Sequence, residues 1–130
     1  MAVKLRENAV TKIATVTGID ATAIATTSLF VVAAGKTLVV TQVVIRCTAF
    51  TVGSKAVQVV ASFGGNASTY DDYLNSVTYT IAASGVAIAD TVLDAAVPVY
   101  AAAVDFRLAI ETASDATAEV WAVDLLGYLV

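Results

Sequence analysis

The chain has 130 residues and a mass of 13.3 kDa, enough for one hydrophobic core and too little for two ordinary domains. Charged residues make up 14% of it, against about 25% in typical soluble domains, while 58% are hydrophobic. A net charge of −4 without a cluster of lysines and arginines argues against nucleic-acid binding, and no apolar run is long enough for a membrane-spanning helix. We therefore expect other protein chains to cover the excess apolar surface.

A polar lead-in, residues 1–8, precedes a single predicted β domain over residues 9–130. Runs rich in Val, Thr and Ala alternate with glycine and small polar residues, which predicts short strands. The expected strands are residues 10–17, 28–32, 37–50, 55–63, 77–81, 86–93, 104–111 and 118–126. About eight antiparallel strands indicate an all-β, jelly-roll-like sandwich, with a closed barrel as the competing architecture.

Glycine 35 is expected to join the strands at 28–32 and 37–50 as a β-hairpin, because glycine adopts the positive φ of a tight turn. Later in the chain, the clearest alternation is in residues 104–111, where Phe106, Leu108 and Ile110 predict a core face. Asp105 and Arg107 on the opposite face predict contact with water.

The strand at residues 37–50 is apolar on both sides. Val39, Val43, Ile45 and Cys47 share one face, which predicts a buried cysteine. The other face is expected to form an oligomer interface, since it is apolar with a few polar groups. Its residues are Leu38, Val40, Gln42, Val44 and Arg46.

The residues for most catalytic and metal chemistry are missing. There is no histidine and one cysteine, so neither a histidine-based nucleophilic site nor ordinary zinc coordination can form within one chain. Gly64 and Gly65 do not belong to a phosphate-binding motif. We expect neither enzymatic activity nor a bound cofactor.

The loop at residues 67–76 allows two further interpretations. Asp71 and Asp72, near Asn66 and Asn75, either cap a turn or supply oxygen ligands to calcium. Its tyrosines, with Tyr79 and Phe63, form either a platform for stacking a sugar or part of a protein interface. The candidate receptor-binding residues are Tyr70, Asp71, Asp72 and Tyr73.

Residues 29–41, LFVVAAGKTLVVT, resemble the F-x-V-P-A-G-K-x-x-V-V-T stretch of small tailed-bacteriophage virion proteins, with Ala33 in place of the proline. The likeness continues in Phe63-Gly64, in Tyr70-Asp71-Asp72 and in the ending VDLLGY at residues 123–128, and so covers most of the chain after Thr26.

The resemblance implies a virion structural protein, a homotrimeric decoration (cement) protein on the outer surface of the capsid, made in the host cytoplasm. Its partners would be copies of itself and the major capsid protein or another virion protein. Lys4, Arg6 and Glu7 of the lead-in would then contact a neighbouring capsid subunit. The alternative is a tail-fibre or baseplate domain that binds host carbohydrate.

Overall fold

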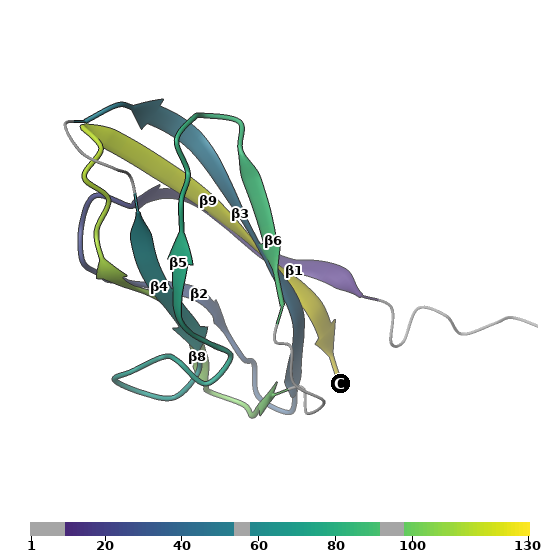
Figure 1. The fold of residues 1–130 in the computed structure, drawn as a ribbon. Helices are drawn as coiled ribbons and strands as arrows, with labels where there is room; N and C mark the ends of the chain where they lie inside the picture. Colours follow the sequence, from purple (N-terminus) through teal and green to yellow (C-terminus); the bar gives the residue numbers. More distant parts are fainter. Residues whose placement is uncertain (1–9, 54–57, 92–97) are drawn as a thin grey trace, which may run out of the picture.

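A computed structural model describes residues 10–53, 58–91 and 98–130. These residues form antiparallel strands packed as two layers (Figure 1). The strands are β1 (Thr11–Asp20), β2 (Thr26–Val31), β3 (Leu38–Thr51), β4 (Val59–Gly64), β5 (Leu74–Tyr79), β6 (Ala87–Asp90), β7 (Val99–Tyr100), β8 (Asp105–Thr112) and β9 (Ala118–Leu129). The prediction of an all-β sandwich is confirmed.

Strand pairing follows a nested order. Sheet A has the order β1-β9-β3-β6, with the two-residue β7 also paired to β3, and sheet B has the order β2-β8-β4-β5. Apart from β7, the first strand pairs with the last, the second with the next to last, β3 with β6, and β4 with β5. This is the pairing of one long hairpin folded over into two sheets, the jelly-roll arrangement.

The predicted hairpin between the second and third strands is wrong. Gly35 does have a positive φ of 73°, but β2 lies in sheet B and β3 in sheet A, so the turn crosses between the layers. Strand β2 pairs instead with β8, more than seventy positions later in the chain, where Ser28 lies opposite Arg107. A glycine turn specifies a reversal of direction, whereas the choice of partner strand depends on which faces both strands must bury.

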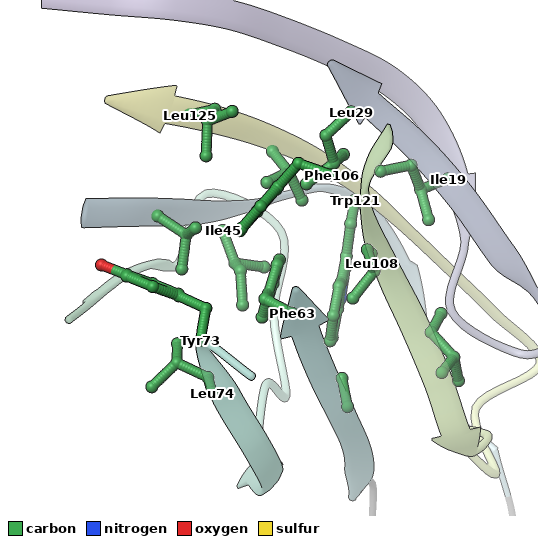
Figure 2. Close-up of a cluster of buried hydrophobic side chains, with 14 of the residues drawn as sticks. Ile19, Leu29, Ile45, Phe63, Tyr73, Leu74, Phe106, Leu108, Trp121 and Leu125 are labelled. Carbon is green, nitrogen blue, oxygen red and sulfur yellow. The ribbon is translucent and has the colours of Figure 1, made fainter. Parts of the chain in front are cut away.

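The core lies between the two sheets, and its largest fully buried side chains include Trp121, Phe63 and Phe106. Figure 2 shows Trp121 and Phe63 close to Leu108 in this layer. The alternation predicted for residues 104–111 is confirmed, since Phe106, Leu108 and Ile110 are all buried. Each such side chain contributes roughly 1.5–3 kcal/mol by leaving water.

The core also contains edge-on aromatic contacts, one buried glutamate and the buried cysteine. Tyr100 meets Phe106 edge-on at 5.1 Å between ring centroids. Trp121 Nε1 donates a 2.7 Å hydrogen bond to Glu119, which is fully buried. Cys47 is buried as predicted, and burial, with the nearby Glu119 charge, raises the pKa of its thiol.

Two irregularities in β3 decide which of its side chains face outward. The register of β3 against β9 shifts between Val40 and Gln42, and again between Cys47 and Ala49. Beside the first shift, Gly127 lies so close to β3 that a Cβ there would be 2.0 Å from the carbonyl oxygen of Val39. Only glycine fits this approach of the two backbones.

Candidate interaction surface

The predicted interface on β3 is wrong for two of its five residues. Leu38 and Val40 have no exposed surface and belong to the hydrophobic core, so neither can contact another chain. The bulge after Val40 adds one residue and thereby reverses the inward and outward alternation. Gln42, Val44 and Arg46, beyond the bulge, are partly exposed and do lie together on the outer face of sheet A.

The register identifies the other apolar residues of this face. Val39 lies between Tyr128 of β9 and Val99 of β7, and Val44 lies opposite Ala89 of β6. Because alternate residues of a strand share a face, Leu126 and Val130 lie on the same side as Tyr128. We call the following set the A patch: Val39, Val44, Ala89, Val99, Leu126, Tyr128 and Val130.

An ion pair adjoins the A patch. Arg46 donates through Nε and Nη2 to the two oxygens of Asp124, at 3.0 and 3.1 Å, and the Thr15 hydroxyl donates to the same carboxylate at 2.7 Å. Partial burial acts to raise the pKa of Asp124, but the bonds from Arg46 and Thr15 outweigh it and hold that pKa below its ordinary value. The three strands β1, β9 and β3 thus share one neutral polar cluster.

The outer face of sheet B has a different character. Arg107 donates to Asp105 at 2.7 Å, on the face that the sequence predicted to meet water. The Glu111 carboxylate accepts hydrogen bonds from the hydroxyls of Ser62 and Ser76, the latter at 2.7 Å. Most polar groups here are therefore bonded within the sheet.

The β4–β5 loop, residues 65–73, is held by side-chain caps. The side-chain carbonyl oxygen of Asn66 accepts hydrogen bonds from the backbone N–H groups of Asp71 and Asp72 at 2.8 and 3.2 Å. Bonds from Asn66 and Thr69 lower the pKa of Asp71. Asp72 accepts from the backbone N–H of Gly65 at 2.8 Å and from the Tyr100 hydroxyl at 3.1 Å. The side chains of Asn66 and Asp72 thus cap backbone N–H groups of the turn, and Asp71 is held by Asn66 and Thr69, in agreement with the capping interpretation.

The predicted aromatic platform in this region is wrong. Tyr73 is only 3% exposed and packs edge-on against Phe106, and Phe63 and Tyr79 are buried as well. Tyr70 is partly exposed, but the guanidinium of Arg107 lies over its ring at 5.6 Å from the centroid. Three of the four aromatic side chains considered for sugar binding are therefore buried in the core, and the ring of the fourth, Tyr70, is in contact with Arg107.

The other predicted contact residues, Lys4, Arg6 and Glu7, lie outside the described residues. Within residues 10–53, 58–91 and 98–130 there is no pocket and no group of three or more Cys, Asp or Glu side chains placed to hold a metal. The same part of the chain contains no helix long and apolar enough to cross a membrane. No protein-family model, curated protein or solved structure matches the chain.

Sequence reasoning missed most of the A patch. Val39 was assigned to the core face, and Val99, Tyr128 and Val130 were assigned to no surface. The alternation of Trp121, Val123 and Leu125 within residues 118–126 puts Leu126 on the opposite face, and two further steps along that face reach Tyr128 and Val130. For Val99 no comparable signal exists, because its strand has two residues.

Proposed function

We propose that this chain is a non-enzymatic structural protein of a tailed-phage virion, a homotrimeric decoration (cement) protein on the outer surface of the capsid. The observation that carries the proposal is a jelly-roll sandwich in which one sheet turns a largely apolar outer face to solvent. Exposed apolar patches on soluble proteins commonly mark contacts with other chains.

Three further points support the proposal. Jelly rolls are common among viral capsid proteins, which is an argument by analogy of fold. The motif at residues 29–41 resembles virion proteins, and its AAGK segment forms the crossing turn between the two sheets. The low content of charged residues, 14%, fits a protein that works with much of its surface covered.

A cement protein would act through linked equilibria. A protein that binds the assembled capsid lattice and not its separated subunits stabilises the lattice by the free energy of that binding. Such a role requires a rigid, preformed surface and no reacting groups. The receptor-binding alternative is not proposed, because the tyrosines on which it depended are buried or covered.

The first test is the mass of the purified protein at micromolar concentration, measured by light scattering. We expect three times the 13.3 kDa of one chain. A monomer at that concentration would contradict the proposal.

The second test adds the protein to heads of the encoding phage that were assembled without it. We expect the protein to co-sediment with the heads and to raise the temperature at which they break open. Removing residues 1–8 is expected to weaken this binding while leaving the oligomer mass unchanged. Full-length protein that stays in the supernatant would contradict the assignment to the capsid.

A further inference from the structure

We infer that the A patch is the surface on which a second copy of this chain docks, an inference that rests on the self-association in the proposed function. Val99 is 62% exposed, and Val39 lies between it and Tyr128 in the register of sheet A. Leu126 and Val44 continue the apolar surface along β9 and β3. The patch therefore extends over four strands, β6, β3, β9 and β7, with Gln42 opposite Leu126 and the Asp124 charge, paired to Arg46, opposite Val44.

The charge of this face favours a second copy as its occupant. The register puts four described charged residues on it, Lys12, Arg46, Asp20 and Asp124, and two positive with two negative charges sum to zero. The corresponding outer face of sheet B carries Asp105, Arg107 and Glu111, which sum to −1. In a chain of net charge −4, this neutral face can approach another copy with less like-charge repulsion than the negative face of sheet B can.

The Arg46–Asp124 ion pair beside the A patch can be buried by a docking chain at little cost. Asp124 already accepts two bonds from Arg46 and one from Thr15, so its charge does not depend on a partner. Covering a charge is costly chiefly when the charge is left unpaired. A docking chain therefore needs no counter-charge at this position.

The strand edges offer a poorer contact than the face. Edge strand β1 is interrupted by register shifts between Lys12 and Ala14 and between Val16 and Ile19. Edge strand β2 has a shift after Ser28. Bulges of this kind bend an edge and hinder the pairing of another strand with it. Association through side chains of the face is therefore favoured over extension of a sheet.

The inference is tested with two matched substitutions. Val99→Glu places a charge in the A patch, and Val31→Glu places the same charge on β2 of sheet B, at a valine that is 54% exposed. Both sites are exposed enough that folding should tolerate the change. Circular dichroism and thermal melting of each variant would check that the fold and its stability are retained. Sedimentation velocity over a concentration series then gives the dissociation constant of each oligomer.

We expect Val99→Glu to weaken self-association at least about tenfold, as removal of a central apolar contact does. Val31→Glu should stay within about twofold of the unmodified chain. Leu126→Glu, at a partly exposed site of the same patch, should reproduce the loss. If both A-patch variants associate like the unmodified chain, or if Val31→Glu dissociates as strongly as they do, the inference is wrong.

The same proteins separate this inference from the proposed function. An oligomer that survives both A-patch substitutions and still binds heads would refute the docking surface and leave the proposed function intact. An oligomer that dissociates on Val99→Glu but whose unmodified form ignores heads would confirm the docking surface and refute the capsid role.

Discussion

The outer faces of the two sheets differ although the same kind of strand builds both. On sheet B, Glu111 and Asp105 collect hydrogen bonds from neighbouring strands, so the polar groups of that face are satisfied by the sheet itself. On sheet A, one cluster around Asp124 is satisfied in this way, and the rest of the face is largely apolar. One outer face of the sandwich therefore satisfies its own polar groups, whereas the other has the apolar area for which we propose a partner chain.

The largest effect is expected from Gly127→Ala, which attacks the geometry that sets the outer face of sheet A. The added Cβ would lie 2.0 Å from the Val39 carbonyl oxygen, so β9 and β3 must move apart. We expect a loss of about 3 kcal/mol in the free energy of unfolding, measured by urea denaturation.

Gly18→Ala is the control for that experiment. Its position has a positive φ of 70°, which Gly127 does not have, and nothing lies within 4 Å of the added Cβ. Only backbone strain should appear, about 1 kcal/mol. Equal losses at the two glycines would show that the close approach of β9 and β3 is not what requires Gly127.

A smaller effect is expected from Glu111→Ala on sheet B. The change removes the acceptor for Ser62, which is fully buried, and for Ser76. We expect the free energy of unfolding to fall by about 1.5 kcal/mol, since a buried hydroxyl loses a charged partner. Thr78→Ala, at an exposed position of β5, should change it by less than about 0.5 kcal/mol. No loss at Glu111 would mean that the polar network of sheet B contributes little to stability.

The smallest of the three effects is expected from Asp124→Asn on sheet A, about 1 kcal/mol at neutral pH, because the pair with Arg46 is only partly buried. The folded-state pKa of Asp124 lies below its ordinary value of 3.8, so the stabilisation is complete above that value and is lost as the pH falls through the lower, folded one.

The measurement for Asp124→Asn is therefore urea denaturation at pH 7 and again at a pH well below 3.8, where the gap between variant and unmodified chain should close. Asp115→Asn, in the exposed β8–β9 loop, removes the same charge and should leave stability nearly unchanged at both pH values. A gap that widens in acid would contradict the role assigned to the Arg46 pair.

Several parts of the fold were predictable because they depend on neighbouring residues. The alternation of Phe106, Leu108 and Ile110 predicted the inward-facing side chains of β8, because the bulge in the pairing of β8 with β4 comes after Ile110. The same reasoning identified the buried Cys47 and a turn at residues 65–73 that is capped by polar side chains. In these cases the local pattern and the final environment agree.

The candidate site was predicted less well because it depends on distant residues. Gln42, Val44 and Arg46 were assigned correctly to an outer face, while Leu38 and Val40 were not, since one added residue at the bulge exchanges the two faces of the strand. Tyr73 is a second example of this dependence on distant residues. Its position in a polar loop suggests exposure to solvent, but its ring packs against Phe106 of β8.

An all-β fold, the inward face of Phe106, Leu108 and Ile110, and the lack of histidine chemistry were all predictable from the order of residues alone. These conclusions follow from composition and from a period of two residues, which are local properties. The pairing of β2 with β8, and the grouping of Val99 and Tyr128 with Val44 on one surface, became evident only in the folded chain. Both depend on contacts between strands far apart in the chain. The close passage of Gly127 past Val39, across more than eighty residues, is one contact of this kind.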